Sequence, residues 1–213
     1  MTAPLDGIVL AGGQSRRLGV DKAGLLFDGR PLLEIVVEKL AAVCQDIVVA
    51  CGRIEDQEGR PALPVRQVAD AEPGRGPLAG LEAGLSAINN EFALVVACDM
   101  PFLNPDLLAY MAGLPRRYQA LVPRVGGRWQ PLQAIYARSC LPLIEKLLAQ
   151  GHNSVEELLS RLDVQVLTED DLPRYDADGL SLFNLNEPQD LERARALWEH
   201  RQRRDLEPAS AAR

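Results

Sequence analysis

The sequence has little of several residue types, and each shortage excludes a class of protein. Only 2 of its 213 residues are histidine, and its 4 cysteines are widely spaced without a CxxC pair. A histidine-rich zinc site and a disulfide framework are therefore not expected. No apolar run approaches the roughly 20 residues that cross a bilayer. No basic segment precedes the short apolar stretch near the N-terminus, so a secretion signal is not expected either. We expect a cytoplasmic protein that does not bind membranes.

Positive charge is also scarce, because the net charge is −7. A nucleic-acid-binding domain normally carries a basic face, so no nucleic-acid partner is expected. The segment from Gln14 to Arg30 is an exception, since its cations outnumber its carboxylates. A cationic loop on an anionic protein indicates a small anionic ligand, although a solvated surface loop would have the same composition.

What the sequence does contain is an alternation of apolar runs and amphipathic segments. The run FALVVAC at 92–98 lacks any polar alternation, as expected for a central parallel strand that is covered on both faces. Strand-to-helix alternation predicts an α/β fold, a Rossmann-like three-layer αβα sandwich with a mostly parallel sheet and helices on both faces. Strands are expected at 5–10, 47–50, 65–69, 92–98, 120–122, 132–136, 164–167 and 182–184. Helices are expected at 31–44, 77–88, 105–114, 141–150, from 155 onward and at 188–201.

No internal repeat and no linker-like break interrupts this pattern, so residues 1–201 are expected to form a single domain. Residues 202–213 are polar and small and are expected to be a disordered tail. Ligands of parallel sheets bind beyond the carboxyl ends of the strands. The loop after Leu10, the segment after Ala69 and Asp99 all follow expected strands, which predicts a ligand site at that edge.

The first of these loops reads LAGGQSRRLGVDK, from Leu10 to Lys22. It matches neither the P-loop pattern nor G-x-G-x-x-G. Its adjacent glycines would let backbone N–H groups meet a phosphate, and its cations would neutralise that phosphate. A glycine turn that carries surface arginines explains the same residues, and composition does not separate the two interpretations.

Carboxylates and amides follow the other strands. Asp99 could hold Mg²⁺ together with phosphate oxygens, or it could be a turn or capping aspartate. Asn184 and Asn186 in FNLNEP point the same way on an extended chain, so they could bind a metal-bound water or a nucleotide. Alternatively, Asn186 or Glu187 caps the helix that begins at Pro188.

The sequence pattern alone does not assign a role to three further residues. Asp70 ends the third strand. Arg75, in the glycine-rich stretch that follows, could meet an anion or be solvated. Trp129 lies in a glycine-containing loop, where it could stack on a flat ligand or fill core space, which is the more common role of tryptophan.

Four segments of the sequence resemble one known family. LAGGQSRRLGVDK followed by LLFDGRPLLE is similar to the N-terminal signature of nucleotidyltransferases that build nucleotide-linked cofactors. DAEPGRGPLAGLEAGL, VVACDMPFL and FNLNEPQDL then follow in the order seen in molybdenum cofactor guanylyltransferases. The resemblance covers about residues 7–197.

The resemblance implies a set of site residues and substrates. It assigns the nucleotide to Leu10, Ala11, Gly12, Gly13, Lys22, Asp70 and Asp99, catalysis to Arg17, Lys22 and Asp99, and Mg²⁺ to Asp99 and Asn186. It implies GTP and molybdenum-molybdopterin as substrates, with proteins that deliver and accept the cofactor as further partners.

Two positions bear on the choice of base. Related cytidylyltransferases tend to have Ala-Gly where this chain has Gly12-Gly13, which favours GTP over CTP. Ala50, however, replaces a nucleotide-contacting asparagine of some family members. A sister transferase that uses CTP or another phosphorylated acceptor, and a non-catalytic nucleotide-binding protein, are the alternatives. A dinucleotide-binding oxidoreductase is disfavoured because G-x-G-x-x-G is lacking.

Overall fold

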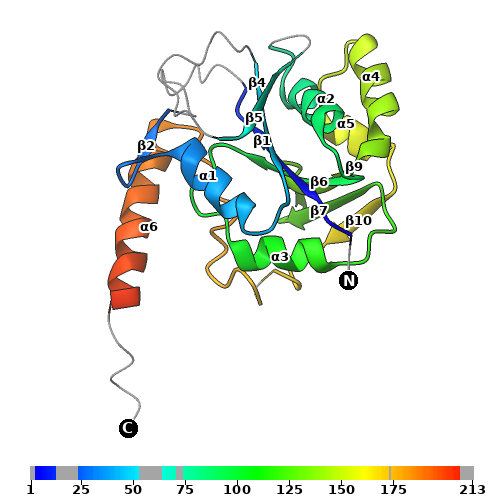
Figure 1. Ribbon diagram of the computed structural model, residues 1–213. Helices are drawn as coiled ribbons and strands as arrows, with labels where there is room; N and C mark the ends of the chain where they lie inside the picture. The colour runs from blue at the N-terminus through cyan, green and yellow to red at the C-terminus, as the bar shows by residue number, and fades with distance from the viewer. Residues whose placement is uncertain (1–2, 13–23, 53–63, 71–73, 173, 207–213) are drawn as a thin grey trace.

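A mixed sheet forms the centre of the molecule, with helices around it (Figure 1). The computed structural model describes residues 3–12, 24–52, 64–70, 74–172 and 174–206. The strands of the sheet are β1 (Asp6–Leu10), β4 (Ile47–Cys51), β5 (Arg66–Ala69), β6 (Phe92–Ala97), β7 (Ala120–Val125), β8 (Arg128–Trp129), β9 (Gln133–Ala137) and β10 (Val164–Leu167). The helices are α1 (Leu32–Ala41), α2 (Pro77–Ala87), α3 (Pro105–Gly113), η2 (Arg138–Cys140), α4 (Leu141–Ala149), α5 (Val155–Leu159) and α6 (Pro188–Leu206). A separate ribbon pairs β2 (Leu26–Phe27) with β3 (Arg30–Pro31).

The strands of the sheet lie in the order β10-β7-β9-β6-β1-β4-β5, and β8 pairs with β7. The pairs β6–β1, β1–β4, β4–β5 and β7–β10 are parallel, whereas β9 is antiparallel to both β6 and β7. All six residues of β6 are buried, as its unbroken apolar sequence predicts. The predicted αβα sandwich with a mostly parallel sheet is confirmed.

Two adjacent residues of β1 show that helices cover both faces of the sheet. Successive side chains of a strand point to opposite faces. A side chain at Gly7 would meet Leu40 of α1, whereas Ile8 lies against Gly84 of α2. Helix α3 contacts α1, and α4 contacts both α2 and α5. One layer therefore contains α1 and α3, and the other contains α2, α4 and α5 (Figure 1).

Capping signals in the sequence mark the helix boundaries. The side chain of Asn104 accepts a hydrogen bond from the backbone N–H of Asp106 at 2.9 Å and caps α3. The side chain of Ser154 caps α5 in the same way, by accepting from Glu157. Gly151 follows α4 with a φ of 84°, a conformation that favours glycine.

Two groups of buried apolar residues stabilise this arrangement. The main core lies between the sheet and the helices on its two faces. A second cluster joins the β2–β3 ribbon, α1, the loop after Asp99, the segment before α6, and α6 itself. Its buried members are Phe27, Leu32, Ile35, Phe102, Leu185 and Ala194, and partly buried side chains such as Phe183 and Trp198 pack against them.

The structure departs from the sequence-based expectations at a few places. Residues 182–184 were expected to form a strand, but Leu182 lies in a turn and residues 183–184 have no regular secondary structure and lie outside the sheet. Helix α6 continues to Leu206, past the expected end at Arg201, and residues 207–213 lie outside the described residues. The sequence pattern also did not indicate the β2–β3 ribbon or β8. No helix among the described residues is long and apolar enough to cross a membrane.

Candidate active site

Backbone hydrogen bonds link the carboxyl ends of the strands into one continuous edge. The N–H of Asp70 donates to the carbonyl of Cys51 at 3.1 Å, and that of Ala11 donates to Ala50 at 2.7 Å. The N–H of Cys98 then donates to Leu10 at 3.1 Å.

A fourth bond adds a segment from far along the chain to this edge. The N–H of Leu185 donates to the carbonyl of Asp99 at 2.9 Å. Leu185 lies between Asn184 and Asn186, so the N-x-N segment lies directly beside Asp99. The structure therefore brings Leu10, Ala11, Gly12, Asp70, Asp99 and Asn186 to one edge, where the strand topology predicted a ligand site.

Asp70 lies at the β5 end of this edge, between Gly12 and α2. A Cβ atom on Gly12 would lie 3.4 Å from Asp70 Oδ2 and 3.0 Å from the backbone nitrogen of Gly52. A Cβ on Gly80 of α2 would lie 3.7 Å from Asp70 Oδ1. Two glycines thus leave space beside a carboxylate that is only 8% exposed.

The environment of Asp70 disfavours its charged form. Burial raises the pKa of Asp70 above its ordinary value, and the nearby carboxylate of Glu82 raises it further. Asp70 Oδ1 is buried and accepts no hydrogen bond from the described residues. A ligand that donates a hydrogen bond there would satisfy this oxygen.

Asp99 lies at the β6 end of the edge, where the donor atoms are carboxylate and amide oxygens. Asp99 is 8% exposed, and Asn186 is exposed. The amide oxygen of Asn184 is buried and accepts no hydrogen bond from the described residues. Mg²⁺ prefers a few such oxygens together with water and phosphate oxygens. The residues at this end therefore fit the expected Mg²⁺.

The described residues contain no group of three or more His, Cys, Asp or Glu side chains that could hold a metal ion. A divalent cation at the β6 end would accordingly take part of its coordination from substrate and water oxygens. The backbone N–H groups of Asn186 and Glu187 both donate to the Asp190 carboxylate, at 2.9 and 2.8 Å. Asp190 thereby holds the start of α6 and the N-x-N segment together.

Some of the other candidate residues lie outside the described part of the chain, and others lie within it. Gly13, Arg17 and Lys22 lie outside the described residues, so their predicted roles stay predictions. Arg75 donates to Asn153 Oδ1 and to a backbone carbonyl at the end of α4, rather than being simply solvated.

Trp129 and Ala50 take part in packing. Trp129 is half-buried against the main core, and the guanidinium carbon of Arg124 lies 5.1 Å from the centre of its ring. Ala50 is fully buried in β4, with its Cβ 4.0 Å from the position that a Cβ of Gly80 would take. A longer side chain at residue 50 would therefore press on α2.

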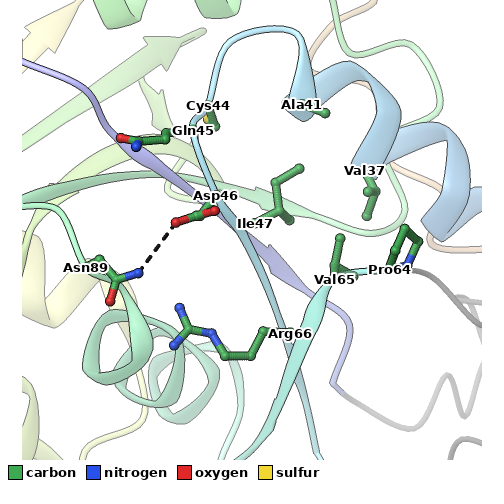
Figure 2. A pocket seen from close by; sticks show the side chains of 10 residues that line it. All are labelled: Val37, Ala41, Cys44, Gln45, Asp46, Ile47, Pro64, Val65, Arg66 and Asn89. Atoms are coloured by element: carbon green, nitrogen blue, oxygen red, sulfur yellow. Dashed lines mark hydrogen bonds between the residues drawn. The ribbon is translucent and has the colours of Figure 1, made fainter.

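A cavity of about 570 Å³ lies at the opposite edge of the sheet, at the amino ends of β4 and β5 (Figure 2). Val37, Ile47 and Val65 form its apolar wall, and Asn89 donates to the Asp46 carboxylate at 3.5 Å across its polar side. The β-strands separate this cavity from Asp70 and Asp99. It is therefore not part of the candidate active site.

Sheet topology and the polar residues at this edge are typical of an α/β protein with a ligand site at the carboxyl ends of its strands. Within this class, the chain belongs to the MobA-like NTP transferase family, whose model matches residues 7–166. The resemblance to molybdenum cofactor guanylyltransferases that the sequence motifs indicate is thereby confirmed.

Individual relatives agree with this family. A molybdenum cofactor guanylyltransferase of Desulfosudis oleivorans is 35% identical over 89% of this chain and 94% of its own length. The molybdopterin-guanine dinucleotide biosynthesis protein A of Archaeoglobus fulgidus is 30% identical and superposes with a TM-score of 0.82 over 92% of this chain and 100% of that chain. A cytidylyltransferase from Thermus thermophilus shares the fold, with a TM-score of 0.65 at 19% identity over 93% of this chain and 100% of that chain. The fold alone therefore does not determine the base.

Proposed function

We propose that this protein transfers GMP from GTP to the terminal phosphate of molybdenum-molybdopterin. The products are a guanine dinucleotide form of the cofactor and pyrophosphate. The observation that carries the proposal is the hydrogen-bonded edge. It places Leu10–Gly12, Asp70, Asp99 and the N-x-N segment along one line in a member of the NTP transferase family.

The β1 and β5 ends of the edge bind the nucleoside part of GTP. Gly12 exposes its backbone, and the space beside Asp70 is open because Gly12 and Gly80 lack side chains. The buried Asp70 oxygen accepts a hydrogen bond from a donor on the guanosine.

The reaction is a direct displacement at phosphorus. A phosphate oxygen of the acceptor forms a bond to the α-phosphorus of GTP, and the bond from that phosphorus to the bridging oxygen of the β-phosphate breaks. Pyrophosphate leaves with the electron pair. The attacking phosphate is already ionised near neutral pH, so no general base is needed. Positioning and charge neutralisation supply most of the rate, and Lys22 and Arg17 offset the charge of the departing pyrophosphate.

Asp99 and Asn186 would hold Mg²⁺, as their oxygens and their position beside each other support. When bound, the ion neutralises phosphate charge. The contribution of the protein is to keep a carboxylate and an amide at fixed positions on the edge. Proteins that deliver and accept the molybdenum cofactor complete the proposed set of partners.

Incubation with the molybdenum cofactor, Mg²⁺ and either GTP or CTP tests the proposal. We expect pyrophosphate and a guanine dinucleotide product with GTP, and little product with CTP. Product with CTP alone would overturn the choice of base and leave nucleotidyl transfer standing. Nucleotide binding without release of pyrophosphate from GTP, whichever acceptor is added, would identify a non-catalytic binding protein.

A further inference from the structure

Ser181 is the centre of a buried polar network that sequence patterns do not indicate. It is fully buried, although it lies in a loop. Its hydroxyl oxygen lies 3.0 Å from Nε2 and 3.4 Å from Oε1 of Gln133, which is also fully buried, on β9. The same oxygen accepts a hydrogen bond from the backbone N–H of Asn104 at 3.1 Å.

The backbone of Ser181 is fixed as well. Its N–H donates to Asp176 Oδ2 at 2.9 Å. Asp176 is itself buried, and burial raises its pKa above the ordinary value, while the backbone N–H groups of Ser181 and Leu180 lower it. A serine hydroxyl can accept two hydrogen bonds and donate one. Gln133 and Asn104 use this capacity, so the network around Ser181 is well satisfied.

This network joins the two segments that carry the proposed metal ligands. Asn104 ends the loop that begins at Asp99, and Ser181 lies five residues before Asn186 in the chain. Gln133 ties both to the sheet, because it pairs with Val96 of β6, the strand that leads to Asp99.

Two further contacts connect the same segments closer to the site. The N–H of Leu185 donates to the Asp99 carbonyl, and the rings of Phe102 and Phe183 meet edge to face with centroids 5.8 Å apart. The contact between the rings holds the two segments together, but it constrains their relative position less than directional hydrogen bonds do. Hydrogen bonds to a buried hydroxyl are directional and costly to leave unmade, so they fix the register of the two segments.

We infer that Ser181 is a positioning residue, which sets Asn186 against Asp99 at the spacing that a divalent cation requires. This inference rests on the proposed function, because it takes Asp99 and Asn186 as the metal ligands. Ser181 acts only through the backbone of both segments. Groups that hydrogen-bond directly to metal ligands commonly change metal affinity about 10–100-fold when they are removed. Because Ser181 is bonded to Asn104 and Gln133 rather than to the ligands themselves, we expect an effect at the lower end of that range.

Metal binding to the protein–GTP complex tests this role without turnover. Mn²⁺, which is visible by electron paramagnetic resonance, is titrated into the complex in the absence of any acceptor. We expect Ser181→Ala to raise the Mn²⁺ concentration for half-saturation about tenfold. Ser160→Ala, which removes an exposed hydroxyl bonded to the Glu157 carbonyl, is the matched control and should bind Mn²⁺ like the wild type.

A second variant separates positioning from loss of folding. Ser181→Cys keeps the shape of the side chain but donates and accepts weakly, so we expect an intermediate Mn²⁺ affinity. All titrations are run at a temperature where circular dichroism shows the variant to be folded. A purely structural role would lower the amount of folded protein without changing the Mn²⁺ affinity of the remainder.

The outcomes distinguish the inference from the proposed function. If Asp99→Asn binds Mn²⁺ as tightly as the wild type, the proposed metal site is wrong, and the role of Ser181 falls with it. If Asp99→Asn loses Mn²⁺ while folded Ser181→Ala and Ser181→Cys bind it like the wild type, only the role of Ser181 is overturned.

Discussion

The main core and the second cluster differ in how they are built from the sequence. In the main core, helix α1 directly precedes β4 in the chain and packs against both β1 and β4. The second cluster collects aromatic residues from three distant regions of the chain, namely Phe27, Phe102, and the pair Phe183 and Trp198. Phe27 contacts the rings of both Phe102 and Trp198, with centroids 5.7 and 5.6 Å apart.

The two groups also support different parts of the molecule. The main core fixes the sheet and so the positions of the strand ends. The second cluster contains Phe102, three residues after Asp99, and Leu185, which is adjacent to Asn186. The comparison predicts that the stability of the sheet and the geometry around Asp99 and Asn186 can be altered separately.

The largest effect should come from removing a ring of the second cluster. Phe102→Ala deletes a fully buried aromatic side chain and should lower the free energy of unfolding by about 3–5 kcal/mol. Because Phe102 supports the Asp99 loop, the folded variant should also lose transferase activity. Urea unfolding and pyrophosphate release measure the two effects.

Leu94→Ala in the middle of β6 is the matched change in the main core. It should cost about 2–5 kcal/mol of stability and leave the turnover of the folded protein close to that of the wild type. Equal activity in folded Phe102→Ala and folded Leu94→Ala would contradict the idea that the second cluster, and not the main core, supports the segments around Asp99 and Asn186. Phe102→Leu serves the same comparison with a smaller loss of volume.

Removing a charge at the active site should reduce the rate without a comparable loss of stability. Asp99→Ala and Lys22→Ala should each lower turnover at least about a hundredfold, or roughly 3 kcal/mol, because in the proposed mechanism each removes an electrostatic group that acts on the reacting phosphates. Asp106→Asn, in the exposed first turn of α3, is the control and should retain activity. Near-normal turnover in either alanine variant would refute the role assigned to that residue.

A smaller effect is expected where α2 approaches β1. A Cβ on Gly84 would lie 2.6 Å from Ile8 Cγ2, inside the main core. Gly84→Ala should therefore destabilise the protein by about 1–3 kcal/mol in thermal unfolding. Gly113→Ala, at the open end of α3 with no atom within 4 Å of the added carbon, should instead gain about 0.5–1 kcal/mol. A stabilising Gly84→Ala would show that β1 and α2 can separate freely.

The smallest effect concerns Lys39, whose Nζ donates to the Pro101 carbonyl at 2.8 Å. Burial, followed by the charge of Arg201, lowers the pKa of Lys39 to about 8. Between about pH 8 and its ordinary pKa of 10.5, the unfolded chain binds this proton and the folded chain does not. Stability from this residue therefore rises with pH across that window and is constant below it.

The unfolding free energy of the wild type relative to Lys39→Met measures this contribution, because other titrating groups are common to both proteins. One pH unit of pKa difference corresponds to about 1.4 kcal/mol. Since Lys39 is partly exposed, we expect the difference to grow by no more than about 2 kcal/mol from pH 8 to 10.5. A difference that stays constant or shrinks over this range would show that the folded protein keeps Lys39 protonated.

Much of the fold could be predicted because its signals are local. The unbroken apolar run of β6 and the capping side chains of Asn104 and Ser154 act within a few residues. Asp70 and Asp99 could be placed at the ligand edge because they follow strands. The direction of each strand in the sheet was harder to predict, because the antiparallel β9 has the same apolar pattern as a parallel strand.

The features that could not be predicted depend on distant partners. Residues 182–184 have the composition of a strand, but they lie outside the sheet because Ser181 is bonded to Gln133 and Leu185 to Asp99. Nothing near Ser181 in the sequence distinguishes it from an exposed loop serine. One signal was present in the sequence. Phe102 follows Asp99 and Phe183 precedes Asn184, so two large apolar side chains lie close to the candidate site residues in the chain.

The bonds that align the strand ends with one another are made by backbone atoms alone. Substitution of a side chain along this line leaves the donors and acceptors in place. Evolution can therefore change which base or acceptor is preferred without rebuilding the frame that presents them. Ala50 shows how the two parts are separate, because its carbonyl accepts one of these bonds while its methyl side chain packs beside α2. The same frame can persist in sister enzymes whose chemical selectivity has diverged.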